Sequence, residues 1–270
     1  MSAAETPDEV EASRAPLLDH LMELRNRLFV VCAAVVLATM VSFAFAQQIY
    51  LFLVEPYRVA FSVVHHIPLS EAKVTLQATS PLEVFYTNLK LALFAGIIVS
   101  FPVIAWQAYA FIAPGLYKKE KAAAAPFMIA APVMFALGCA FVYYVAMPYA
   151  MRFALGTTVS TGNVQIALNA KVDQYFGLVT TLILAFGFVF QVPVVLALLG
   201  FAGIVDAQML RKGRRYAILA IAVFSAMVTP PEPISMLIMA IPVYLLYEAS
   251  IWIVWLIEKA RAKDDAVAPT

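Results

Sequence analysis

The feature that most constrains this chain is a series of long apolar runs, separated by short segments that hold most of the charged residues. Of its 270 residues, 63% are apolar and only 13% are charged, about half the charged fraction of a typical soluble domain. A single aqueous core cannot bury so much apolar surface, so the bilayer must solvate it. The runs cover residues 28–46, 81–113, 122–147, 173–199, 215–229 and 234–250. We therefore predict an all-α polytopic membrane protein with six transmembrane helices.

The predicted spans differ in length. The second would reach about 50 Å as a helix, against a hydrocarbon core of about 30 Å, so it must tilt, kink or project, and Pro102 is the expected kink. The fifth is short, because Pro230 and Pro231 form a turn that no helix runs through. The sixth reaches Glu248 after a similar distance, so we predict that the last two helices are short and that Glu248 lies at the far membrane border. A full-length sixth helix with Glu248 at the midplane is the alternative.

Most of the basic residues gather on one side of the predicted spans. They are Arg14, Arg25 and Arg27, then Lys118, Lys119 and Lys121, then Arg211, Lys212, Arg214 and Arg215, then Lys259, Arg261 and Lys263. The positive-inside rule places this side, and both termini, in the cytoplasm. We expect residues 1–16 to form a disordered cytoplasmic tail, residues 17–258 a single six-helix membrane domain, and residues 259–270 a second cytoplasmic tail.

The segments on the opposite side are long and contain apolar and aromatic side chains, which indicates structured caps rather than simple linkers. They cover residues 47–80 and 148–172. The second span opens with a capping box, in which Ser80 caps the helix, Pro81 occupies its first turn and Glu83 reaches back to the backbone. Asp173 is expected to cap the fourth span.

Residues 17–28 carry apolar side chains at helical spacing, which predicts an amphipathic helix on the cytoplasmic surface before the first span. Glu23 and Arg27 lie four residues apart on this helix and can pair. One interpretation is an interfacial anchor with a solvated ion pair. The other is that Glu23 forms half of an acidic receptor site.

A second acidic residue, Glu120, lies on the same side, in a predicted short loop beside Lys118. It could simply balance the neighbouring lysines. However, the turn at Pro114 and Gly115 directs the following residues along the membrane surface. A carboxylate in such a partly dehydrated interface matches a guanidinium with two hydrogen bonds, and therefore better than it matches an ammonium. Such a site would distinguish arginine from lysine.

Six motifs in order along the chain resemble the TatC family, the receptor subunits of the twin-arginine protein translocase. They are HLMELRNR at 20–27, SPLEVF at 80–85, FIAPGLYKKE at 111–120, FGFVFQVP at 186–193, RKGRRY at 211–216 and TPPE at 229–232. Each motif alone is weak, but the ordered combination is specific and leaves only the tails uncovered.

The resemblance implies a concave, glove-like bundle in the cell inner membrane, with a cytoplasmic site for the paired arginines of signal peptides on folded cargo. Carried over by position, Glu120 is the principal arginine partner, and Glu23, Arg25 and Lys118 belong to the same surface. The implied partners are single-span TatB-like and TatA-like subunits near the fifth and sixth spans, in an oligomeric complex. Transport in the family uses the proton-motive force, and this chain has no Walker-type glycine-rich loop.

The chain departs from the family in the fourth span, where many members carry an intramembrane Glu and this chain has Gln191. Since Gln does not titrate, a proton-relay role is in doubt, whereas a polar docking site for a partner helix remains possible. A Gln satisfied within its own bundle is an equally supported interpretation. Met227, Thr229 and Met236 complete the predicted docking surface, although methionines at such places are more often packing residues.

Other function classes find less support. A small-molecule or ion secondary transporter is the main alternative, but such proteins usually show internal repeats and ionisable groups at the bilayer midplane. We predict no enzyme activity, because no nucleophile–base pair emerges on facing spans. His65 and His66 lack a spaced partner, so we expect no metal site and no cofactor. The net charge of +1 gives no reason to expect nucleic-acid binding.

Overall fold

The computed structural model describes the backbone of residues 7–112, 118–157, 160–161, 164–165, 170–229 and 232–267, with side chains for 20–111, 126–157, 170–229 and 232–261. The elements are α1 (Pro7–Ala44), α2 (Ala46–His65), α3 (Pro81–Ile112), α4 (Lys118–Phe141), the π-helix η2 (Val142–Ala146), α5 (Met147–Gly156), β1 (Ser160–Thr161), β2 (Val164–Gln165), α6 (Val172–Val189), α7 (Val192–Phe201), α8 (Ala207–Val228) and α9 (Pro233–Val267). Apart from the short antiparallel β1–β2 pair, the regular structure is helical, as predicted.

Within the described residues, five stretches are long and apolar enough to cross a membrane. They are His20–Ala44, Pro81–Phe111, Pro126–Gly156, Val172–Phe201 and Pro233–Arg261. Helix α8 is not among them, because its first half carries four basic residues, at 211, 212, 214 and 215. The multi-pass helical architecture is therefore confirmed, whereas a sixth span through α8 stays a prediction.

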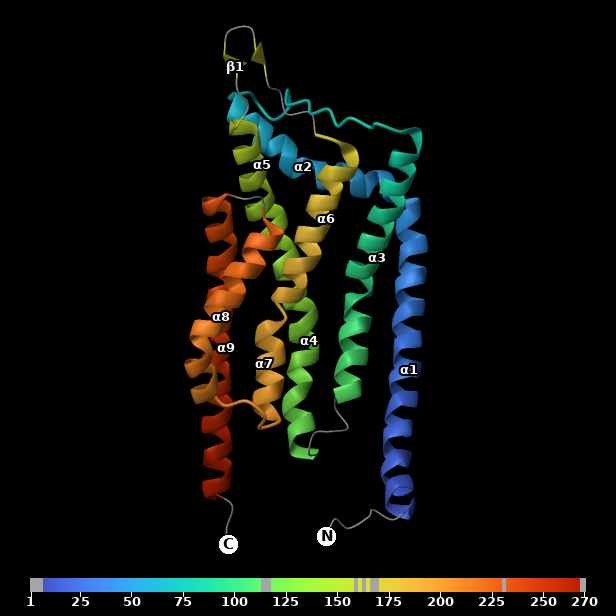
Figure 1. Ribbon diagram of the computed structural model, residues 1–270, viewed down its shortest axis with the longest axis vertical. Helices are drawn as coiled ribbons and strands as arrows, with labels where there is room; N and C mark the ends of the chain where they lie inside the picture. The colour runs from blue at the N-terminus through green and yellow to red at the C-terminus, as the bar shows by residue number, and fades with distance from the viewer. Residues whose placement is uncertain are drawn as a thin grey trace.

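The long helices lie side by side along one axis (Figure 1). Helix α1 packs mainly against α3, α6 lies between α3 and α4, and the α8–α9 hairpin packs on the other side of the bundle through contacts of α9 with α7. Helix α1 begins and α9 ends at the same end of the bundle. The two ends of the described chain therefore lie at one end of the bundle, while their placement in the cytoplasm stays a prediction.

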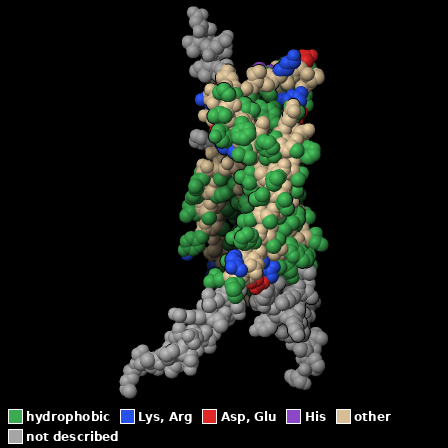
Figure 2. Space-filling view, turned by 90° about the vertical axis from the view of Figure 1, so that its right-hand side faces the viewer, with side chains coloured by type: hydrophobic (Ala, Val, Ile, Leu, Met, Phe, Trp, Pro, Cys, Tyr) green, Lys and Arg blue, Asp and Glu red, His purple; other side chains and the backbone are tan. Residues whose placement is uncertain are grey.

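The outer surface is apolar along the length of the bundle. Figure 2 faces the α1 side and shows hydrophobic side chains over the middle of the molecule, with charged side chains near its two ends. On α1, Phe29 is 70% exposed and Met40 is 68% exposed. Leaving such side chains in water would be costly, so this surface fits a hydrocarbon environment.

Helix α1 differs from its prediction, because it is one continuous helix from Pro7 to Ala44. Residues 17–28 thus continue the axis of the span instead of forming a separate helix along the membrane surface (Figure 1). The helix also begins inside the segment 1–16, which we predicted to be a disordered tail. This segment contains Glu and Ala, which favour helix once a stable helix is present to extend.

Prolines shape the other long helices in different ways. Helix α3 continues through Pro102, where the sequence predicted a kink. Between α6 and α7 the helix is interrupted at Gln191, because Pro193 has no N–H to donate to the carbonyl of Val189. The predicted fourth span therefore follows one path as two helices.

The first outer segment forms a cap, as predicted, whereas part of the second lies outside the described residues. Helix α2 lies across one end of the bundle (Figure 1). The buried hydroxyl of Tyr175 on α6 donates to the carbonyl of Leu53 at 2.7 Å, and the hydroxyl of Tyr143 on η2 donates to the carbonyl of Phe52 at 2.9 Å. The backbone of Gln77 also pairs with the strand-like segment before α6. Helix α2 is thus anchored to two spans.

The predicted capping role of Glu83 at the start of α3 is confirmed by hydrogen bonds. Its Oε2 accepts from the backbone N–H of Ser80 at 3.3 Å and from the N–H and hydroxyl of Thr79 at 2.6 and 2.7 Å. Its Oε1 also accepts from the N–H of Asp173 at 3.2 Å, which links α3 to α6. Asp173 itself lies in the first turn of α6 and pairs with Lys90 at 2.5 Å, while Lys171 occupies the N-cap position. The expectation that Asp173 caps α6 is therefore wrong.

Both helices of the final hairpin are longer than predicted, since α8 begins at Ala207 and not at 215. Helix α9 starts with Glu232 as a capping acid, which accepts from the N–H and hydroxyl of Ser235, and continues to Val267. It thus passes both the predicted end of the sixth span at 250 and the predicted domain boundary at 258. The extension of α9 stabilises the N-terminus of α8, because the side chain of Glu258 accepts a hydrogen bond from the N–H of Ala207 at 2.7 Å.

Candidate functional site

The end of the bundle where the basic residues gather is organised by contacts between α1 and α3. The ring of His20 on α1 stacks on Phe111 on α3, with centroids 4.3 Å apart. About two turns further along α1, Arg27 donates from Nη1 to the side-chain oxygen of Gln107 at 3.3 Å. Because the two helices run in opposite directions, these two contacts fix the register of α1 against the C-terminal end of α3.

Glu23 lies on α1 between these two contacts. Its Oε1 accepts from both Nε and Nη2 of Arg27, at 3.0 and 2.5 Å. The side chain of Glu23 is 35% exposed and that of Arg27 is 24% exposed. The predicted pairing of these residues is confirmed, and the carboxylate is half-buried rather than fully solvated.

Arg25 has a different partner from this pair. It is exposed, and its guanidinium makes a long hydrogen bond of 3.4 Å to the side chain of its neighbour Asn26. A group of this kind adds positive potential to the surface without being held in one place. Arg25 therefore lies near Glu23 on the same helix but does not share its contacts.

The structure places Glu120 differently from its prediction. Helix α4 begins at Lys118, so the backbone of Glu120 belongs to the first helical turn and not to a loop. An acidic residue is favoured there, because the N-terminal end of a helix carries a partial positive charge. The side chains of Lys118 and Glu120, and the residues Pro114 and Gly115, lie outside the described part of the chain. In Figure 1 the start of α4 lies at the same end of the bundle as the C-terminal end of α3 and the N-terminal half of α1.

Gln107 and Phe111 were not predicted from the sequence to belong to this region. Gln107 had a signal, since it is an isolated amide in the apolar run of α3. An amide within a span must find a partner, and Arg27 is that partner. Phe111 had no comparable signal, because an aromatic residue at the end of an apolar run is common.

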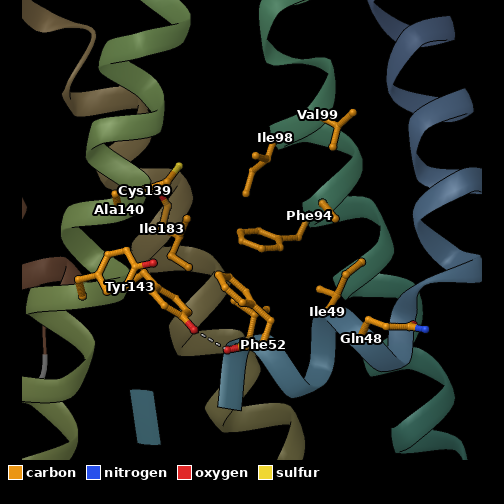
Figure 3. Close-up of a pocket in the computed structure, with 13 residues that line it drawn as sticks. Gln48, Ile49, Phe52, Phe94, Ile98, Val99, Cys139, Ala140, Tyr143 and Ile183 are labelled. Carbon is orange, nitrogen blue, oxygen red and sulfur yellow. Dashed lines mark hydrogen bonds between the residues drawn. The ribbon is translucent and has the colours of Figure 1, made fainter. Parts of the chain in front are cut away.

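An apolar pocket of about 480 Å³ lies further along the bundle, between α3 and the α4–η2 segment (Figure 3). Phe94, Ile98 and Val99 line one wall, and Cys139 and Tyr143 line the other. Helix α2 closes one end with Phe52, whose carbonyl accepts the Tyr143 hydroxyl in the hydrogen bond drawn in Figure 3. The π-helix η2 makes the Tyr143 side of this wall. A pocket with this lining takes hydrocarbon groups.

The residues predicted to dock a partner helix have different surroundings. Gln191 is half-buried, and its Nε2 donates to the carbonyl of Ala131 on α4 at 2.9 Å. Met227 is 81% exposed, whereas Met236 is half-buried. Thr229 is buried, and its hydroxyl donates to the carbonyl of Ser225 at 2.7 Å. Of this set, Met227 is the most available to a partner, while Pro230 and Pro231 lie outside the described residues.

Comparisons with known proteins agree on one family. Residues 19–242 match the family model of the Sec-independent protein translocase protein TatC. A TatC protein of Magnetococcus marinus is 38% identical over 253 residues, which cover 94% of this chain and 89% of that protein. The TatC protein of Escherichia coli strain K12 is 34% identical over 237 residues, covering 88% of this chain and 87% of that protein.

The fold agrees as well. A crystal structure described as the twin arginine translocase receptor TatC superposes with a TM-score of 0.73 at 33% identity, covering 88% of this chain and 99% of that one. The resemblance and fold class inferred from the sequence motifs are thereby confirmed. The chain is a multi-pass helical component of a protein translocase rather than an enzyme, and it belongs to the TatC family of Sec-independent protein translocase proteins.

Proposed function

We propose that this chain is the signal-peptide receptor of a twin-arginine translocase in the cell inner membrane. In this proposal the cytoplasmic ends of α1, α3 and α4 bind the paired arginines at the front of signal peptides on folded cargo. Glu23 and Glu120 each accept one guanidinium. Arg25 and Lys118 belong to the same surface and make its electrostatic potential more positive.

The observation that carries this proposal is the setting of Glu23. Its carboxylate is half-buried, and it lies on a helix whose register against α3 is held on both sides, by the His20–Phe111 stack and the Arg27–Gln107 contact. A preorganised, partly desolvated carboxylate binds a guanidinium more strongly than a freely solvated one does. The solved relative is itself described as a twin arginine translocase receptor.

Charge placement supports the orientation that the proposal needs. The starts of α1, α4 and α8 and the end of α9 lie at one end of the bundle (Figure 1), and most of the basic residues of the sequence lie in or near these segments. By the positive-inside rule this end faces the cytoplasm, which is the side from which cargo arrives.

The apolar segment that follows the arginines would lie along the membrane face of the bundle, where the pocket between α3 and η2 offers a hydrocarbon-lined surface. TatB-like and TatA-like single-span subunits would pack near α8 and α9, next to the exposed side chain of Met227. The oligomeric complex so formed uses the proton-motive force. A partner contact by Gln191 has to use the amide groups left over from its bond to Ala131.

Direct peptide binding tests the receptor role. A fluorescent signal peptide with two arginines is titrated against the purified full chain in detergent, next to the same peptide with two lysines. We expect the arginine peptide to bind more tightly, and we expect Glu23→Gln and Glu120→Gln each to weaken its binding about ten-fold, as for loss of one charge-assisted hydrogen-bonded pair.

Glu71→Gln is the matched control, because Glu71 is an exposed acid in the segment between α2 and α3, at the other end of the bundle. It removes the same charge and should leave the affinity unchanged. Equal binding of both peptides to all variants would show apolar partitioning only. In that case the receptor role fails, and a small-molecule or ion transporter becomes the better assignment.

A further inference from the structure

We propose that Arg27 is a built-in competitor for the guest arginine. Its guanidinium is bonded to both Glu23 and Gln107 while the site is empty, and it keeps only the contact to Gln107 when the guanidinium of a peptide takes its place on Glu23. This inference rests on the proposed function, because it concerns the same carboxylate.

The Glu23–Arg27 pair uses only one of the two oxygens of the carboxylate. Nε and Nη2 of Arg27 both converge on Oε1, whereas a fork-to-fork pair would use both carboxylate oxygens. Within the described part of the chain, Oε2 of Glu23 accepts no hydrogen bond. An incoming guanidinium can therefore bind Oε2 first and displace Arg27 from Oε1 afterwards.

Gln107 provides the alternative position for Arg27. Its side-chain oxygen already accepts from Nη1 at 3.3 Å, so Arg27 keeps one partner when it releases Glu23. Moving from Glu23 towards Gln107 needs only a rotation of the Arg27 side chain, because the His20–Phe111 stack holds α1 against α3 independently. The displaced charge stays hydrogen-bonded, which avoids an unpaired cation in a half-buried place.

Because of this competition, the site binds the peptide less tightly than it would without Arg27. Both partners are partly exposed, at 24% and 35%, and partly exposed ion pairs contribute modestly, so displacement of Arg27 should weaken peptide binding by about two- to five-fold. When the peptide leaves, Arg27 returns to the carboxylate. A receptor that must hand its cargo on gains from a contact that limits how tightly the peptide is held.

The test compares Arg27→Gln with Lys212→Gln and Glu23→Gln in the full chain, with the fluorescent arginine peptide and its lysine counterpart. Lys212→Gln removes one exposed positive charge from α8 at the same end of the bundle, so it reports the effect of net charge alone. We expect Arg27→Gln to tighten binding of the arginine peptide about two- to five-fold. The gain should be absent in Lys212→Gln and in the double variant Glu23→Gln/Arg27→Gln.

A second variant keeps the test valid if Arg27→Gln folds poorly. Arg27→Lys keeps the charge but matches the carboxylate less well, so it should tighten binding in the same direction by a smaller factor. Unchanged or weaker binding in these variants, with Glu23→Gln still weakening it, would overturn the competitor role while the receptor role stands. A gain that persists without Glu23, or that Lys212→Gln reproduces, would also overturn it. If wild-type protein does not prefer the arginine peptide, the receptor role itself fails.

Discussion

Gln191, at the break between α6 and α7, donates from its side-chain amide to the backbone carbonyl of Ala131 on α4, at 2.9 Å. This bond joins two residues that are 60 positions apart in the chain, at the place where Pro193 interrupts the backbone hydrogen bonding of the helix. The two interpretations that the sequence left open, an amide that serves its own bundle and an amide that serves a partner helix, are thereby compatible. One N–H of the amide is used within the bundle, and the rest of the group can still face a partner.

Replacing Gln191 by Leu separates these two roles. We expect the variant to co-purify less of the single-span partners, because a polar contact between helices in lipid contributes about 1 kcal/mol, while its affinity for the arginine peptide stays at the wild-type value. Gln174→Leu on α6 removes an exposed amide outside this contact and serves as control. If Gln191→Leu co-purifies as much partner as the wild type but melts at a lower temperature, Gln191 serves the bundle alone.

The crossing of α4 and α6 leaves no space at Gly187. A Cβ added there would lie 2.6 Å from the ring of Phe135, which is 2% exposed and stacks on Phe101 with centroids 3.7 Å apart. Because the ring cannot give way, we expect Gly187→Ala to destabilise the protein by about 1–3 kcal/mol. Thermal unfolding in detergent, followed by circular dichroism, measures the change.

Gly177 on the same helix is the matched control, since an added Cβ there meets nothing within 4 Å. Gly177→Ala should be neutral or slightly stabilising, because alanine favours helix over glycine. Equal melting temperatures for the two variants would show that α4 and α6 are not in close contact at Gly187.

The Tyr175 hydroxyl should matter for the cap formed by α2. It is the buried donor to the carbonyl of Leu53, so Tyr175→Phe leaves that carbonyl without this partner at a cost of about 1–3 kcal/mol. We expect a lower melting temperature and faster proteolysis of the segment that contains α2. Tyr149→Phe, in which the removed hydroxyl belongs to a side chain that is 47% exposed, should behave like wild type. An unchanged melting temperature and proteolysis rate for Tyr175→Phe would mean that apolar packing alone holds α2.

Glu83 and Asp173, two carboxylates at the outer end of α3 and α6, should differ in how much they contribute to stability. The Lys90–Asp173 pair is 61% and 50% exposed, and such pairs contribute little, so Lys90→Met should melt close to wild type. Glu83→Gln should melt lower, because Glu83 accepts from three groups at the start of α3 and from the N–H of Asp173 on α6. The reverse order of melting temperatures would contradict this assignment.

The parts of the fold that could be predicted depend on near neighbours in the chain. The Glu23–Arg27 pair follows from a spacing of four residues on a helix, and the role of Glu83 follows from its place three residues after Ser80. Both are present in the structure. The loop assigned to Glu120 was wrong for a related reason: lysines and a proline–glycine turn nearby suggested a loop, but helix α4 already begins at Lys118.

Contacts between distant segments could not be predicted in the same way. Nothing in the sequence around Arg27 indicates that its second partner is Gln107, 80 residues later. Asp173 is a good helix cap by type, yet its backbone N–H is taken by Glu83 and its carboxylate by Lys90, both on α3. Likewise, the helix propensity of the residues after 250 does not predict that α9 continues past them. The contact that Glu258 makes with the start of α8 is visible only in the tertiary structure.

By itself, the sequence determined that the chain crosses a membrane several times and which family it resembles, and it predicted on which side the charges lie, because apolar length, charge placement and short motifs are local properties. Only the tertiary structure decided that α1 is one continuous helix held against α3, that Gln191 bonds to α4, and that Arg27 lies between Glu23 and Gln107. These outcomes depend on which helices pack side by side and in which register, and the free energy of that packing comes from residues far apart in the chain.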